Sequence, residues 1–225
     1  MDRPVSRRTG GPVFVVGAGP GIGASVAHRF ARESHPVGLI ARNRDRLMAI
    51  ADDLRDGGHH AAAVTGDITD PGDITRALGE LTATLGTPEV VCFSPLPDVR
   101  RIRSVLDTTA EDVKDALALT VVGATAVVQA VLPGMLDRGS GTLLFTTGGA
   151  AVRPSPERAA SAVVYAGLSS YIDLLGQALP QRGIHVGRVT IVGAVGPGLA
   201  HEPDDIAEHL WHQHASPGKT VTVLT

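Results

Sequence analysis

The fold is decided by the stretch Gly17-Ala18-Gly19-Pro20-Gly21-Ile22-Gly23, which joins an apolar run at residues 12–17 to an amphipathic segment at residues 22–32. Glycine adopts the backbone angles of a tight turn and has no Cβ to hold an anion at a distance. The first turn of a helix offers free N–H groups and the positive end of the helix dipole. A strand, a glycine turn and a helix in this order predict a pyrophosphate site. The residues expected to contact the pyrophosphate are Gly17, Gly19, Gly21, Ile22 and Gly23.

The rest of the chain alternates short β-type runs with amphipathic segments of helical period. The expected strands are residues 12–17, 35–41, 61–65, 89–93, 142–146, 184–192 and 220–224. The expected helices are residues 22–32, 44–55, 70–85, 110–136, 157–179 and 203–211. Strict alternation predicts an α/β fold, with a Rossmann-type doubly wound parallel sheet of about seven strands and helices on both faces. We expect a single domain that spans residues 1–225.

Composition excludes several classes of function. Hydrophobic residues make up 43% of the chain, charged residues 19%, and the net charge is -3, as in an ordinary globular enzyme. With no basic excess and 3% aromatic residues, the chain is not expected to bind nucleic acid. The longest apolar stretch, residues 121–132, is too short to span a bilayer, so no membrane association is expected. Cys92 is the only cysteine, which indicates a reducing, cytoplasmic compartment.

The end of the second expected strand indicates which dinucleotide binds. Ala41 stands where an acidic residue would bind the ribose 2′-hydroxyl of NAD, and Arg42 follows it. A guanidinium group is always charged and matches the geometry of a phosphate, so Arg42 predicts NADP(H) as the cofactor. The alternative is a solvent-exposed arginine in an arginine-rich segment.

The spacing of Gly17, Gly21 and Gly23 resembles the Gly-x-x-x-Gly-x-Gly pattern of the short-chain dehydrogenase/reductase (SDR) family. Similar segments occur in that family at residues 131–135, 139–141 and 183–186. The resemblance implies hydride transfer between the nicotinamide and a carbonyl or alcohol carbon. It also implies adenine contacts from Asp67 and Ile68. Ser94 and Leu96 fall in the segment where the family has a cofactor-binding Asn-Asn-Ala-Gly.

The same resemblance implies an incomplete catalytic site. Tyr165 matches the family's catalytic tyrosine, but Ser169 occupies the position of its lysine, one helical turn later. Gly148 stands at the serine position with Thr147 beside it, and Thr120 stands at the asparagine position. The expected catalytic residues are therefore Tyr165, Thr147 and Ser169. A tyrosine without a cationic neighbour has a pKa of about 10, so it serves as a proton donor in reduction more readily than as a base in oxidation.

Four histidines lie near the end of the sequence, namely His201, His209, His212 and His214. Their spacing matches no recognised metal site, so no metal is expected. We interpret them as part of an exposed helix end.

The expected function is an NADP(H)-dependent oxidoreductase that acts on a small carbonyl or alcohol substrate. The alternatives are a non-catalytic NADP(H) sensor or assembly partner, an enzyme of non-redox chemistry, and a scaffold that binds no cofactor. Residues 110–136 and 157–179 carry more apolar side chains than one sheet-facing stripe needs. The second segment also has small residues, and in the family the equivalent helices form an interface, so we expect a homo-oligomer, either a dimer or a tetramer. The small residues are Ala162, Ala166, Gly167 and Ser170.

Overall fold

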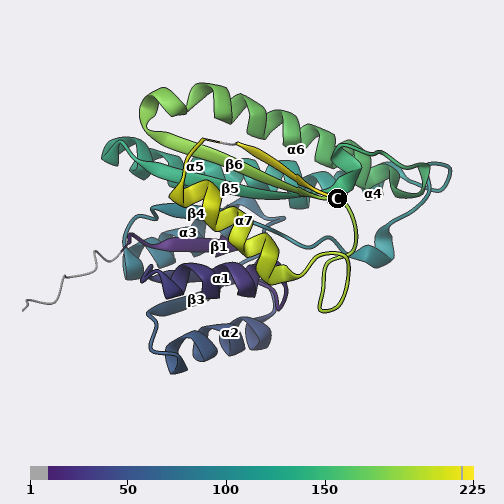
Figure 1. Ribbon diagram of the computed structural model, residues 1–225. Coiled ribbons are helices and arrows are strands. Elements are labelled where there is room, and N and C mark those ends of the chain that lie inside the picture. The colour runs from purple at the N-terminus through teal and green to yellow at the C-terminus, as the bar shows by residue number, and fades with distance from the viewer. Residues whose placement is uncertain (1–9, 219) are drawn as a thin grey trace, which may run out of the picture.

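The computed structural model describes residues 10–218 and 220–225. They form one parallel sheet covered by helices on both faces (Figure 1). The seven strands lie in the order β3-β2-β1-β4-β5-β6-β7, which confirms the predicted doubly wound fold. The strands are β1 (Val13–Val16), β2 (Val37–Ala41), β3 (Ala61–Thr65), β4 (Val90–Phe93), β5 (Gly141–Gly148), β6 (Ile184–Ile191) and β7 (Val221–Leu224).

Alternation along β1 explains why the sheet is covered on both sides. Phe14 and Val16 pack into one buried cluster, whereas Val13 and Val15 pack into the other. The first cluster contains side chains of α3 (Pro71–Leu85), α5 (Gly123–Arg138) and α6 (Ala159–Ala178). The second contains side chains of α1 (Ile22–Arg32), α2 (Arg44–Asp56) and α7 (Pro203–Ala215).

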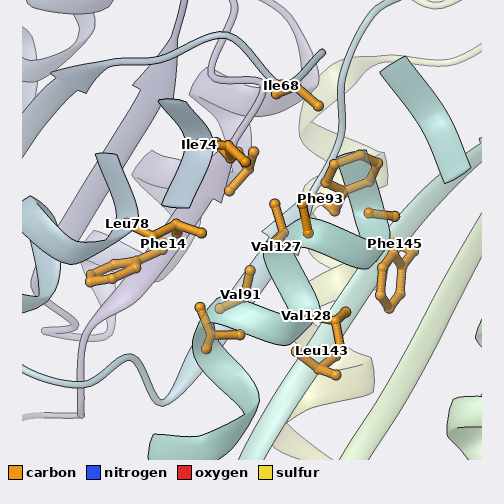
Figure 2. Close-up of a cluster of buried hydrophobic side chains, with 14 of the residues drawn as sticks. Phe14, Ile68, Ile74, Leu78, Val91, Phe93, Val127, Val128, Leu143 and Phe145 are labelled. Atoms are coloured by element: carbon orange, nitrogen blue, oxygen red, sulfur yellow. The ribbon is translucent and has the colours of Figure 1, made fainter. Parts of the chain in front are cut away.

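The first cluster is the larger aromatic core. Figure 2 shows Phe14, Phe93 and Phe145 of three strands with side chains of α3 and α5 between and beside them. The rings of Phe93 and Phe145 lie 6.2 Å apart. This core fixes the strands whose carboxyl ends carry the candidate site.

Local sequence sets the starts of the helices that follow β2 and β3. The Asn43 side chain accepts a hydrogen bond from the backbone N–H of Arg46 and caps α2. Asp70 accepts from the N–H groups of Gly72 and Asp73, with Pro71 in the first turn of α3. The expected boundaries therefore agree closely with the structure here.

The expected helix at residues 110–136 is interrupted. It consists of α4 (Ala110–Leu117), a π-helical turn η2 (Ala118–Val122) and α5. At the end of this turn Gly123 packs on Ile68 so closely that a Cβ on residue 123 would overlap the Ile68 side chain. The wide turn and the missing side chain together let the helix pass the loop after β3.

α7 is longer than expected and covers α1. Arg29 of α1 pairs with Glu208 at 2.5 Å, and its guanidinium lies 4.5 Å from the centre of the Trp211 ring. His214 packs against Phe30 and lies 3.0 Å from the hydroxyl of Thr142 through Nδ1. The expectation of an exposed helix end is therefore wrong for His214, because this end of α7 packs on α1 and on the start of β5.

Two helical segments, Ala110–Arg138 and Pro156–Ala178, are long and apolar enough to cross a membrane by length and composition alone. Core helices of globular proteins have the same properties. Here α5 and α6 pack their buried faces on the sheet.

Candidate functional site

The glycine turn after β1 combines close packing with an open side. Gly17 has φ +92°, and a Cβ there would lie 2.7 Å from the Ser94 carbonyl oxygen and from Pro95 Cα. A Cβ on Gly23 would lie 2.8 Å from Ala18 Cα. By contrast, a Cβ on Gly19 or Gly21 would meet nothing within 4 Å. The first pair brings the backbone segments together, and the second pair borders open space.

α1 begins at this open space. No side chain caps its N-terminus at Gly21, and its first turn contains no acidic residue. Ile22, the first residue of α1, is half-buried against the core cluster of α1, α2 and α7. Uncapped N–H groups at a helix N-terminus and glycines that leave room for a ligand together suit a bound pyrophosphate.

Arg42 and Asp67 follow the two neighbouring strands β2 and β3. The Arg42 side chain is exposed and makes no ion pair with the residues that the structure describes. The Asp67 carboxylate accepts hydrogen bonds from the backbone N–H of Thr69 at 2.9 Å and from its hydroxyl at 2.7 Å. Ile68 is only 6% exposed, and its side chain packs in the core and anchors this loop to it.

Ser94 and Leu96 follow β4 in very different environments. Ser94 is buried, and its Oγ accepts a hydrogen bond of 2.8 Å from the hydroxyl of Thr146 on β5. Leu96 is 81% exposed. Thr146 was not expected from the sequence to contribute to the site. The Thr-Thr-Gly sequence at the carboxyl end of β5 could have indicated that Thr146 lies at the site.

Tyr165 reaches the end of β5 from the second turn of α6. A Cβ on Gly148 would lie 2.7 Å from Cε2 of the Tyr165 ring. Burial raises the pKa of the Tyr165 hydroxyl, and no charged group among the described residues offsets this effect. The phenol therefore keeps its proton at neutral pH.

Ser169 and Thr147 occupy different surroundings. Ser169 lies one helical turn after Tyr165, and its Oγ is buried without a hydrogen-bond partner among the described residues. Thr147 is 2% exposed, and its hydroxyl pairs with that of Thr190 at 2.9 Å. It is Gly148, not Thr147, that lies beside the Tyr165 ring. The structure thus brings Tyr165 and Gly148 together and engages Thr147 with β6.

The π-helical turn η2 holds Thr120, which the sequence resemblance predicts at the asparagine position. Thr120 is 3% exposed, and its hydroxyl donates to the Ala116 carbonyl oxygen at 2.6 Å. The Thr120 hydroxyl proton is therefore engaged in a hydrogen bond within the helix and is not free to be donated to a ligand.

The loop after β6 lies against the carboxyl end of β5. His201 Nε2 donates to the Val192 carbonyl oxygen at 3.0 Å, and the N–H of Gly198 donates to the Glu202 carboxylate at 2.7 Å. A Cβ on Gly149 would lie 2.8 Å from Val192 Cα, so this loop abuts the end of β5. Gly193, Gly196 and Gly198 all have positive φ. These glycines shape a loop that its own hydrogen bonds hold in place.

Comparison with known sequences is consistent with this geometry. The model of the family described as short chain dehydrogenase matches residues 12–203. Glucose 1-dehydrogenase of Gluconobacter oxydans (strain 621H) is 30% identical over 214 residues, which cover 90% of this chain and 74% of that protein. Oxidoreductase UcpA of Salmonella typhimurium is 28% identical over 225 residues, covering 98% of this chain and 80% of that protein.

Solved structures share the fold. A short-chain dehydrogenase from Rhodopseudomonas palustris superimposes with a TM-score of 0.86 at 23% identity, covering 96% of this chain and 98% of that one. A short chain oxidoreductase from Pseudomonas aeruginosa PAO1, solved with NADPH bound and containing an atypical catalytic center, gives a TM-score of 0.85 at 21% identity, covering 94% of each chain.

Proposed function

Because this chain belongs to the short chain dehydrogenase family, we propose that it is an NADP(H)-dependent oxidoreductase that reduces the carbonyl group of a small substrate, with Tyr165 as the proton donor. The observation that carries the proposal is the position of the Tyr165 ring at the carboxyl end of β5, on the same edge of the sheet as the glycine turn.

The cofactor half of the site fits a dinucleotide. The open side of Gly19 and Gly21 and the uncapped start of α1 suit the pyrophosphate. Arg42 is assigned to the ribose 2′-phosphate because it follows β2, which pairs with β1. Asp67 is assigned to the adenine amino group because it follows β3, the next strand, which pairs with β2. NADPH, when bound, supplies a hydride to the substrate carbon. The alternative for Arg42, a merely exposed arginine, is tested below.

In the catalytic half, Tyr165 acts without the family's usual helpers. We propose that the site is degenerate, with Gly148, Ser169 and Thr120 in place of the serine, lysine and asparagine. The neutral Tyr165 hydroxyl donates its proton to the carbonyl oxygen as negative charge develops there. Burial destabilises tyrosinate, and no cation among the described residues offsets this effect, so alcohol oxidation is slower than carbonyl reduction. The Pseudomonas aeruginosa oxidoreductase with an atypical catalytic center supports the view that this fold accommodates NADPH beside an altered site.

We also propose that the chain forms a homo-oligomer through α6. Val163 and Leu174 are 54% and 60% exposed. They lie three helical turns apart on one face of α6, with the small residues Ala166, Gly167 and Ser170 exposed between them. Small residues allow a second helix to approach closely, and exposed apolar side chains gain from being covered. A cytoplasmic location remains our proposal, and the buried Cys92 thiol, whose pKa is raised by burial to about 12, suits a reducing compartment.

The decisive experiment titrates the protein with NADPH and with NADH, following nucleotide fluorescence. We expect Arg42→Ala to weaken NADPH binding about tenfold or more and to leave NADH binding unchanged, since it removes a guanidinium–phosphate pair. Arg44→Ala, an exposed arginine in the first turn of α2, is the matched control and should change neither affinity. If neither nucleotide binds the wild-type protein, the reductase proposal is wrong.

A non-catalytic NADP(H) sensor or assembly partner is the second candidate, favoured by the absence of a side chain at Gly148. It predicts tight NADPH binding without NADPH oxidation across a panel of carbonyl compounds. Reduction of any carbonyl compound that is lost in Tyr165→Phe would exclude it.

A further inference from the structure

A cavity of about 290 Å³ opens among the loops that follow the strands. Arg42 and Thr69, which belong to the cofactor half of the site, form part of its lining. The remaining walls come from the loop after β4, from α4 and from the start of α6. These walls carry residues to which the proposed function gives no role, and the polar ones among them include Arg101, Arg103, Arg158 and Ser161.

The arginines of this cavity are unequally neutralised. Arg101 is paired with Asp115 at 2.5 Å. Arg103 Nε lies 3.7 Å from Asp112, whose carboxylate already accepts hydrogen bonds from the hydroxyl and the N–H of Thr109. The exposed Arg158 side chain forms no ion pair with the residues described. The Arg42 side chain is likewise exposed and forms no ion pair with the described residues.

Asp98, the third carboxylate of the lining, does not neutralise these arginines. Asp98 pairs at 2.9 Å with Arg100, a residue that does not line the cavity. Among the described residues, the cavity therefore presents Arg42 and Arg158 without ion-pair partners, and Arg103 with one shared partner 3.7 Å away. Guanidinium groups gathered around a concave surface repel one another and attract an anion with which they form paired hydrogen bonds.

The cavity also lies along the helix that carries Tyr165. Ser161 precedes Tyr165 by one helical turn, so the two residues share one side of α6, and Arg158, seven residues before Tyr165, is the N-cap residue of this helix. A rise of about 1.5 Å per residue puts Arg158 roughly 10 Å from Tyr165 along the axis. A ligand held at Arg158 can therefore place a group about that far away beside the phenol.

We propose that this cavity binds an anionic group of the substrate, with Arg158 and Arg103 as its ligands. The substrate class is then a carbonyl compound that carries a carboxylate or a phosphate roughly 10 Å from the reacting carbon. This inference rests on the proposed reductase function, and it names the substrate class of the same site.

The test compares suberic semialdehyde with its methyl ester, a pair that differs in the terminal charge. Each is titrated into protein saturated with NADP⁺, which cannot reduce the aldehyde, and binding is measured by calorimetry. We expect the acid to bind about tenfold or more tightly than the ester, because only the acid pairs with the guanidinium groups. The preference should disappear in Arg158→Gln and persist in part in Arg158→Lys. Arg153→Gln, at an exposed arginine outside the cavity lining, should leave it intact.

Two results would overturn the inference. One is equal binding of acid and ester by the wild-type protein. The other is an Arg158→Gln variant that loses affinity for NADPH but not for NADH, because the cavity would then serve the 2′-phosphate of the cofactor. If the protein binds no nucleotide, the reductase proposal fails separately. The anion site is then tested by calorimetric titration with suberate, where binding that is lost in Arg158→Gln supports it and no binding overturns it.

Discussion

The ring of Tyr165 lies against the backbone of Gly148, where a Cβ would be 2.7 Å from Cε2 and 3.3 Å from Cζ. The Tyr165 ring can therefore occupy this position only because residue 148 has no side chain. A serine at residue 148 would require the Tyr165 ring to move.

Gly148→Ser is expected to destabilise the protein by about 1–3 kcal/mol, because the added atoms force the ring out of its present position. The free energy of unfolding in urea measures the effect. In a Tyr165→Ala background the same substitution should be nearly neutral. An equal loss of stability in both backgrounds would show that residue 148 clashes with something other than the ring.

Tyr165→Phe is expected to slow carbonyl reduction by roughly 10²–10⁴-fold, because the proton donor is lost. NADPH affinity should stay within about twofold, as measured by fluorescence titration. A variant with wild-type reduction rates would show that the proton comes from another group.

The direction of the reaction should respond to pH in a defined way. The pKa of Tyr165 is raised from 10.0 by burial, so the proton-donating form persists through the neutral range and is lost only as pH rises past that value. Reduction should therefore be independent of the ionisation of Tyr165 between about pH 6 and pH 9. Oxidation, which uses tyrosinate, should rise about tenfold per pH unit up to at least pH 10. A plateau of the oxidation rate near neutral pH would contradict this assignment.

His214 should make the stability of the fold sensitive to acid. Its pKa is lowered from 6.5, first by burial and then by the nearby charge of His35, with His185 acting in the same direction and Glu89 opposing. The unfolded chain then binds more protons than the folded one, so this contribution is complete above pH 6.5 and is lost as pH falls below it.

His214→Gln should flatten the pH dependence of the unfolding free energy between about pH 7 and pH 5, since glutamine does not titrate. His209→Gln, at an exposed position of the same helix, is the matched control and should follow the wild-type curve. Parallel curves for the wild type and His214→Gln would exclude His214 as the acid-sensitive group.

Val163→Glu is expected to shift the assembly toward smaller species in sedimentation at micromolar concentration, because it places a charge in the proposed α6 interface. Val99→Glu, at an exposed position in the loop after β4, should leave the assembly unchanged. A wild-type protein that sediments only as a monomer would refute the proposed homo-oligomer.

The sequence predicts the parts of the molecule that depend on neighbouring residues. The start of α1 follows from the glycine turn, and the start of α3 follows from Asp70 and Pro71. The π-helical turn at residues 118–122 contains no proline or glycine, so its own sequence does not predict an interruption of the helix. It becomes understandable only once Ile68 is seen to press on Gly123.

The candidate site divides in the same way. Most residues predicted to bind the cofactor lie in short motifs directly after β1, β2 and β3, so their prediction depends only on neighbouring residues. The Ser94–Thr146 hydroxyl pair joins residues from two strands, and the arginine-lined cavity joins Arg103 to Arg158. Contacts between distant segments depend on the packing of the whole sheet, and sequence spacing does not reveal them.

The cover that α7 provides over α1 has a consequence for synthesis. Phe30 and Trp211, whose rings lie 5.1 Å apart, are separated by most of the chain, so α1 leaves the ribosome long before its partner exists. Until residues 203–215 emerge, the apolar side of Phe30 has no helix to cover it. The nascent chain therefore completes this half of the fold only late in translation. A chain truncated before α7 would expose this apolar surface, and exposed apolar surface promotes aggregation and binding by chaperones.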